Sequence, residues 1–346
     1  MRYVPLGFIF ETKGNMCFFE TEIELLKGLG LSNSCIVNPL LQCVSPTLDF
    51  HAGPVGKLPV ASTVAYTAVQ SAKSAVDYAV FDWNAYERSW SFQSPPFLAV
   101  TLERESTVES SYIAWITRNR VTISEMKRLE EENNRLFIDA YGLRGELTPD
   151  VPIEQITLTV NPAYRYGGNL TEDEQWARFR QDTMQELISY AIGCMMGRYS
   201  LDEPGLIYAH AGNVGFDPTR YKTFPADADG IVPLTDEFWF EDDAAHRVRE
   251  FLRAVWGADT LDENMAWLAE SLGTKANETP DETIRRYLAD KFFKDHLQTY
   301  KKRPIYWLFS SGKQGAFQAL VYLHRYFDGT LARLRAEYVV PLTGKM

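Results

Sequence analysis

The sequence predicts a mixed α+β protein in which helices dominate after residue 61. Its 346 residues are 45% hydrophobic and 13% aromatic, which is enough to fill sizeable cores and excludes disorder, collagen and coiled coil as the main description. Runs of β-forming residues lie near the N-terminus and at residues 306–309, whereas helical periodicity prevails over much of the remainder.

The N-terminal elements are predicted from turn residues between apolar runs. Residues 6–19 place β-formers on both sides of Lys13-Gly14-Asn15, which predicts a hairpin. Residues 22–29 are expected to form a short helix. Residues 48–60 indicate a strand, a turn rich in Gly and Pro, and a second extended piece.

Residues 61–147 have helical character, and the clearest helix is predicted at residues 124–141. Ser124 is a good N-cap residue, and Gly142 is a typical stop signal. The apolar residues of this segment recur at helical spacing, so one face would pack against a core or join two domains.

Further along the chain, alternating apolar residues predict a strand at residues 155–161, and residues 182–196 predict a helix. Thr279 opens another helix, because Thr can cap and the following Pro and acidic residues suit a first turn. Residues 306–309 are expected to form a core strand, followed by a turn and a helix at residues 313–326.

The charge is distributed unevenly. The whole chain carries a net charge of −11, and residues 201–282 hold eighteen acidic against six basic residues. Residues 285–335, by contrast, hold eleven basic and three acidic residues. Such asymmetry indicates a surface that faces nucleic acid, with a solvated helix face as the alternative.

Other function classes receive no support. The four cysteines form no C-x-x-C pair and the five histidines are scattered, so no metal site is predicted. The longest uncharged runs, residues 28–48 and 58–72, are interrupted by prolines and carry polar residues, so no membrane span is expected. The N-terminus lacks the pattern of a secretory signal, which indicates the cytoplasm.

The tetrapeptide Asn161-Pro162-Ala163-Tyr164 is similar to the Asn/Asp-Pro-Pro-Tyr/Phe motif with which amino-group DNA methyltransferases hold a flipped base. Asn161 would accept a hydrogen bond from the exocyclic amine, and Tyr164 would stack on the base. The second proline is missing, and no Phe-x-Gly-x-Gly loop follows a strand. Residues 212–215 hold the nearest glycine pair. A structural corner is therefore the favoured interpretation.

Two segments of the basic part could bind phosphate. Lys301, Lys302 and Arg303 directly precede the aromatic strand, a pattern that suits backbone phosphates, although a solvent-exposed loop is an equal alternative. Lys313 lies in a Ser-Ser-Gly-Lys turn that lacks phosphate-loop spacing but could contact one DNA phosphate. No catalytic constellation stands out, because Asp242 and Asp243 are expected in an acidic surface run.

Several ordered segments resemble the C-terminal part of the PglX family, the adenine-specific DNA methyltransferases of BREX phage-defence systems. Gly197-Arg198-Tyr199-Ser200 and Pro304-Ile305-Tyr306-Trp307 are the most specific pieces. The other matching segments are residues 134–143, 161–167, 186–202, 292–296, 303–313 and 322–326, and residues 46–50 and 53–60 resemble the end of the target-recognition region.

The resemblance implies a division into the end of a target-recognition region (residues 1–60), a helical spacer (61–147) and a mixed, mostly helical C-terminal domain (148–346). It also implies that the methyltransferase motifs lie upstream of this chain, which would hold no catalytic residue and no cofactor. S-adenosylmethionine would serve the parent enzyme, which methylates adenine N6. The expected partners are double-stranded DNA, the upstream methyltransferase domain and other BREX proteins.

On this hypothesis the chain is the DNA-recognition and C-terminal portion of a site-specific adenine methyltransferase. The predicted DNA-binding residues are Lys301, Lys302, Arg303, Lys313, Arg325, Arg165 and Tyr166. Two alternatives stay open. The acidic stretch could make the chain a protein-interaction scaffold that docks other BREX components. Asn161 and Tyr164 could instead serve a small, self-contained methyltransferase.

Overall fold

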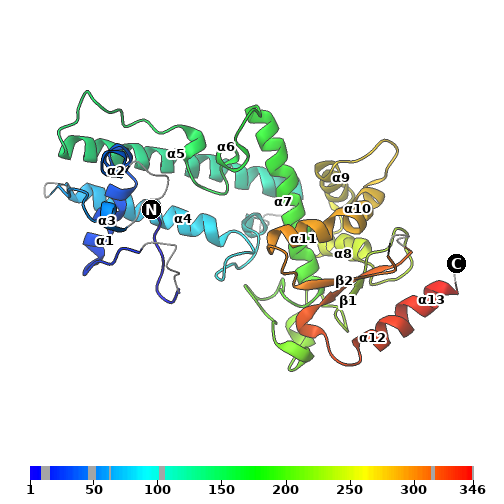
Figure 1. The fold of residues 1–346 in the computed structure, drawn as a ribbon. Helices are drawn as coiled ribbons and strands as arrows, with labels where there is room; N and C mark the ends of the chain where they lie inside the picture. Colours follow the sequence, from blue (N-terminus) through cyan, green and yellow to red (C-terminus); the bar gives the residue numbers. More distant parts are fainter. Residues whose placement is uncertain (9–15, 46–51, 62–63, 101–105, 313–315, 345–346) are drawn as a thin grey trace. The chain divides into compact units, whose positions relative to one another are not determined.

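The computed structural model describes residues 1–8, 16–45, 52–61, 64–100, 106–312 and 316–344. The fold is α+β, with many helices and a small antiparallel sheet (Figure 1). The chain forms two compact units, each built from two separate stretches of sequence. The first unit comprises Met1–Trp83 and Arg118–Asn169, and the second comprises Asn84–Thr117 and Leu170–Met346.

The first unit is helical. Its elements are α1 (Glu22–Ser32), α2 (Val37–Val44), α3 (Ala52–Val55), α4 (Tyr66–Asn84), most of α5 (Val108–Ala140), a 3-10 turn (Ile153–Gln155) and α6 (Pro162–Tyr166). Thr21 and Glu24 form a capping box at the start of α1, which confirms the predicted helix there. Buried Ile36, Phe137 and Ile138 belong to its main core cluster.

Several predictions for the first unit were wrong. The helix predicted at residues 124–141 is present as the second half of α5, but its predicted start was wrong. α5 begins at Val108, and Ser124 lies inside it, where its hydroxyl donates to the Arg120 carbonyl instead of capping. Residues 155–161 form turns and not a strand, because Asp82 accepts the backbone N–H groups of Thr159 and Val160.

The predicted N-terminal β elements lie partly outside the described residues. The centre of the predicted hairpin, residues 9–15, lies outside the described residues, as do residues 46–51 of the predicted strand. The flanking residues 6–8 and 16–19 are irregular, and residues 52–55 form the helical turn α3.

The second unit combines helices with the sheet. Its helices are α7 (Glu172–Met195), α8 (Ala244–Trp256), α9 (Leu261–Leu272), α10 (Pro280–Tyr287), α11 (Phe293–Thr299), α12 (Thr330–Arg333) and α13 (Val340–Thr343), with π-helical turns at Leu288–Phe292 and Leu334–Val339. Thr279 and Glu282 form a capping box, so the predicted opening of α10 is confirmed. The helix predicted at residues 182–196 is confirmed as the second half of α7.

The sheet has the strand order β1-β3-β2, with β1 (Ile231–Pro233), β2 (Tyr306–Ser310) and β3 (Gln318–Tyr322) all antiparallel. β2 confirms the predicted strand. The helix predicted at residues 313–326 was wrong, because Val321 in β3 pairs with both Ile231 and Trp307 and is buried in the sheet. Leu334 and Tyr338 cover the face that carries Ile231 and Val321.

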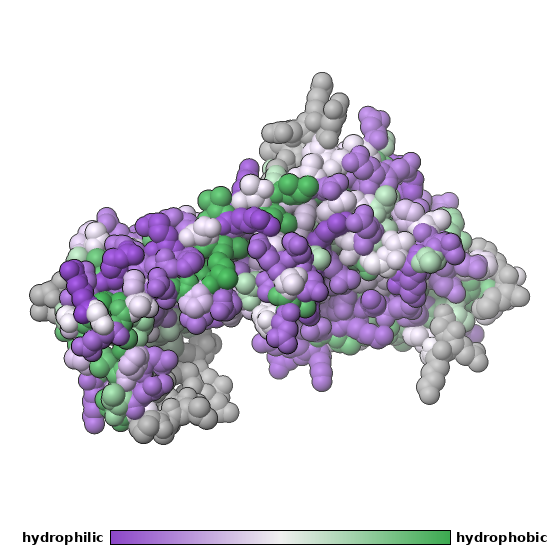
Figure 2. Space-filling model, turned by 90° about the horizontal axis from the view of Figure 1, so that it is seen from above, coloured by the Kyte–Doolittle hydropathy of each residue, from purple (hydrophilic) through white to green (hydrophobic). Residues whose placement is uncertain are grey.

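The surface is mainly polar on the face in Figure 2, where hydrophilic side chains surround smaller hydrophobic groups. Among the described residues, no helix is long and apolar enough to span a bilayer. The described residues also contain no group of three or more His, Cys, Asp or Glu side chains suited to a metal ion.

Candidate nucleic-acid interface

Lys301, Lys302 and Arg303, which we call the basic turn, follow the end of α11 and are exposed. The Lys302 N–H donates to the Leu297 carbonyl at 2.7 Å, and the Arg303 N–H donates to the Tyr300 carbonyl at 2.9 Å. These bonds close the helix end and reverse the chain toward β2. Three adjacent cations are thereby held on a short, hydrogen-bonded turn.

The backbone of the basic turn is strained. Lys301 has φ 49° and Lys302 has φ 63°, so two successive residues with side chains occupy the left-handed region. Each such residue costs about 1 kcal/mol relative to glycine, which adopts this conformation readily. Cations here do complement the C-terminal dipole of α11. A fixed backbone also limits the directions in which the two ammonium groups can extend.

His296 anchors the chain immediately behind the basic turn. Its Nε2 accepts the backbone N–H groups of Ile305, at 3.1 Å, and of Tyr306, at 3.3 Å. These bonds assign the neutral tautomer with the proton on Nδ1. Burial lowers the pKa of His296 to about 4, with a smaller effect from the Arg198 charge. The anchor is therefore uncharged at neutral pH.

Tyr300 anchors the other side of the basic turn. Its hydroxyl donates to Oε1 of Glu87 at 2.6 Å. The same carboxylate accepts from Tyr199 at 3.2 Å and from Ser189 at 2.8 Å, and Nε of Arg198 lies 3.7 Å from Oε1. Only 11% of the Glu87 side chain is exposed, so this polar cluster fixes the turn to the body of the second unit.

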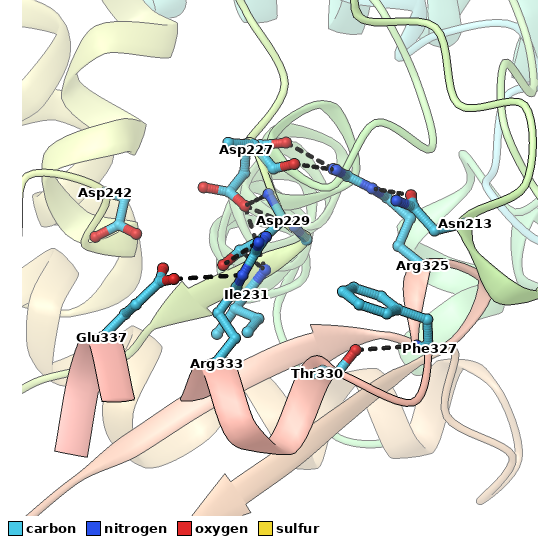
Figure 3. A network of polar contacts seen from close by, with 12 residues as sticks. Asn213, Asp227, Asp229, Ile231, Asp242, Arg325, Phe327, Thr330, Arg333 and Glu337 are labelled. Carbon is cyan, nitrogen blue, oxygen red and sulfur yellow. Dashed lines mark hydrogen bonds and ion pairs between the residues drawn. The ribbon is translucent and has the colours of Figure 1, made fainter. Parts of the chain in front are cut away.

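Arg325 lies in the interior and not at the surface. Its Nη1 and Nη2 donate to the Asp227 and Ala228 carbonyls, both at 2.7 Å, and Nε donates to Asn213 Oδ1 at 3.0 Å (Figure 3). The guanidinium also stacks 3.7 Å from the Phe216 ring centroid. Because Arg325 is 0% exposed, a direct phosphate contact is not available to it, and we leave it out of the candidate interface.

The segment at residues 212–215, which holds the glycine pair, helps to hold Arg325 in place. Gly212 has φ 78° and Asn213 has φ 59°, and together they form a 3-10 turn that brings the Asn213 amide to the guanidinium. A loop for S-adenosylmethionine would connect a strand to a helix. These residues do not fit that arrangement.

Asp227 and Asp229 form a compact acidic cluster near Arg325. Asp227 Oδ1 accepts the N–H groups of Asp229 and Gly230, and Asp229 Oδ1 accepts the N–H of Ile231 (Figure 3). Burial and the neighbouring Asp227 raise the pKa of Asp229 to about 8. Asp243 is also buried, so its predicted place in a surface run was wrong. These carboxylates organise the fold.

Asn161 is a structural residue. It is 1% exposed, and its Nδ2 donates to the Ile153 and Ile156 carbonyls at 2.8 and 2.9 Å. Its Oδ1 accepts the Ala163 N–H at 3.2 Å and caps α6. Both ends of the amide are engaged, so Asn161 cannot hold a base without breaking this turn. The favoured structural interpretation agrees with these contacts.

Two of the other predicted site residues, Arg165 and Tyr166, lie in the first unit. Both are half-buried on α6, with the Arg165 guanidinium 5.6 Å from the Tyr166 ring centroid. Lys313 lies outside the described residues. Lys301, Lys302 and Arg303 lie together in the basic turn. Sequence reasoning missed Glu87, because no spacing pattern links it to Tyr300, 213 positions away.

Comparison with known proteins identifies two long methyltransferases as similar. No family model matches the chain. The chain is 45% identical to the adenine-specific methyltransferase BrxX of Escherichia coli O9:H4 (strain HS), over its whole length and 29% of that protein. It is 40% identical to the adenine-specific methyltransferase PglX of Lacticaseibacillus casei (strain Zhang), over 99% of this chain and 27% of that protein. The chain is thus homologous to parts of two adenine-specific methyltransferases and spans less than a third of either.

Proposed function

We propose that this chain is the DNA-recognition and C-terminal portion of a site-specific adenine-N6 methyltransferase of a BREX phage-defence system. The basic turn is the observation that carries the proposal, and the two methyltransferase relatives support it. On this proposal the chain acts in the cytoplasm on double-stranded DNA, together with an upstream methyltransferase domain and other BREX proteins.

Lys301, Lys302 and Arg303 would neutralise phosphates of the duplex backbone. Three exposed cations can release condensed counterions, which gives affinity that falls as salt rises but carries no sequence information. Arg165, Tyr166 and Lys313 are further proposed DNA contacts. Sequence readout would require base contacts in addition to those of the basic turn.

Methyl transfer itself would be carried out by residues outside this chain, with S-adenosylmethionine bound there. The buried, fully engaged amide of Asn161 argues against the alternative of a self-contained methyltransferase. The scaffold alternative keeps one supporting observation, the excess of acidic residues over residues 201–282, which would repel DNA and favour a basic protein partner.

The test measures duplex affinity of the 346-residue chain at several salt concentrations. We expect the triple variant Lys301→Ala/Lys302→Ala/Arg303→Ala to bind more weakly and to reduce the salt slope by about two to three. The matched control, Lys222→Ala/Arg253→Ala/Lys275→Ala, removes three exposed cations from the acidic stretch. Absence of duplex binding at low salt, or equal loss in both triple variants, would contradict the proposal.

A further inference from the structure

Trp90 is an unusually exposed aromatic residue in the second unit. Its side chain is 95% exposed, compared with 41% for Trp307 in β2. Indole is among the largest apolar side chains, and leaving it in water forgoes the stabilisation that burial would give. This indole is thus available for contact with another molecule.

The turn that carries Trp90 is held firmly. The Ser89 N–H donates to the Tyr86 carbonyl at 2.9 Å, and the Ser89 hydroxyl donates to Asn84 Oδ1 at 2.6 Å while accepting the Ser91 N–H. On either side of the turn, Tyr86 and Phe92 are buried. The exposed indole thus extends from a rigid base, which limits the conformational entropy lost on binding.

The same turn is joined directly to the basic turn. Glu87, three residues before Trp90, accepts the 2.6 Å hydrogen bond from Tyr300, which immediately precedes Lys301. Figure 1 shows the segment that follows α4 next to the end of α11. The Glu87 carboxylate therefore links the segment that carries Trp90 to the residue directly before the three exposed cations.

We propose that Trp90 stacks on an unpaired or extruded nucleobase of the DNA whose phosphates are bound by Lys301, Lys302 and Arg303. This inference rests on the proposed function. Cations that bind the backbone, combined with an aromatic ring that stacks on an unpaired base, are the elements of a nucleic-acid contact. Positive charge favours DNA over a basic protein segment as the occupant, and Lys291 and Lys294, near the start of α11, are also exposed.

The experiment compares the 346-residue chain with Trp90→Ala and Trp90→Phe in binding to a duplex that carries an unpaired fluorescent base analogue. Loss of one stacking contact is expected to weaken affinity about 5- to 100-fold in Trp90→Ala. Trp90→Phe should recover most of this loss. The salt slope should stay unchanged, because no charge is removed, and the wild-type change in analogue fluorescence should disappear in Trp90→Ala.

The control is Phe238→Ala, which removes a ring that is 57% exposed elsewhere in the second unit. It should bind DNA like the wild type. If Trp90→Ala binds duplex as tightly as the wild type while the triple basic-turn variant is weakened, the stacking inference fails and the proposed function stands. If the wild-type chain binds no duplex at low salt, the proposed function fails as well.

Discussion

The Arg285 guanidinium donates a 2.7 Å hydrogen bond to the carboxylate of Asp243, which is 1% exposed. Asp243 also caps α8 by accepting the Ala245 and His246 N–H groups, and Arg285 donates to the Thr235 carbonyl. This pair shows that the first cation of the basic segment 285–335 serves the fold and not the surface.

We expect Arg285→Ala to lower the free energy of unfolding by about 3 kcal/mol, because removing one partner leaves a buried charge uncompensated. Chemical denaturation measures the loss. Arg333→Ala is the control, because the Arg333 side chain is 41% exposed and lies 3.9 Å from its partner Asp229. Similar losses in the two variants would contradict the structural role of the pair.

Asp229 makes stability depend on pH. Its pKa is raised to about 8 by burial and by Asp227, so the protonated form is favoured in the folded state. Stability should therefore fall as pH rises from the ordinary carboxyl range through about 8. The variant Asp229→Asn keeps an acceptor for the Ile231 N–H and cannot ionise. Its thermal midpoint should therefore exceed that of the wild type above pH 8. In mild acid, where the wild-type carboxyl is protonated, this difference should disappear. An unchanged pH profile in Asp229→Asn would refute this assignment.

The strain in the basic turn gives a prediction in which stability and binding move in opposite directions. Lys301→Gly and Lys302→Gly should each stabilise the fold by up to about 1 kcal/mol, since glycine relieves the left-handed backbone. Duplex affinity should fall in the same proteins. The controls are Lys301→Ala and Lys302→Ala, which should lose affinity without gaining stability. A stability gain in these alanine variants would show that removal of the charge, and not relief of the backbone conformation, stabilises the fold.

Replacement of Arg325 should affect folding before it affects DNA binding. Arg325→Met would leave the acceptors on Asp227, Ala228 and Asn213 without their donors, at a cost of about 1 to 3 kcal/mol for each buried group. Thermal unfolding should show a large loss of stability. A well-folded Arg325→Met protein whose only defect was weak duplex binding would return Arg325 to the interface.

Local signals in the sequence predicted local structure well. The Thr279 capping box, the helix around residues 182–196 and the strand at residues 306–309 depend on neighbours within a few positions. The segment Gln318–Tyr322 was predicted as a helix but is a strand. It forms a strand because it pairs with β1, through Ile231, and with β2, through Trp307, and neither partner lies within a few positions of it in the sequence.

The candidate site was only partly accessible to sequence reasoning for the same reason. Clustering of Lys301, Lys302 and Arg303 can be read directly from the chain. The burial of Arg325 cannot, because its acceptors come from residues about 100 positions upstream. Trp90 also gives no sequence signal, since nothing in its neighbours distinguishes a solvent-exposed indole from a core one.

The interleaving of the two compact units restricts how the protein can be dissected. A fragment that starts at Leu170 would lack residues 84–117, which supply Glu87 to Tyr300 and Trp115 to the ring of Phe179. In that fragment the Tyr300 hydroxyl and the Phe179 ring would lose these partners and face water. No single cut therefore yields an intact unit, since a start at Leu170 removes these partners and a start at residue 84 separates Ile36 from Phe137 and Ile138 in the core of the first unit.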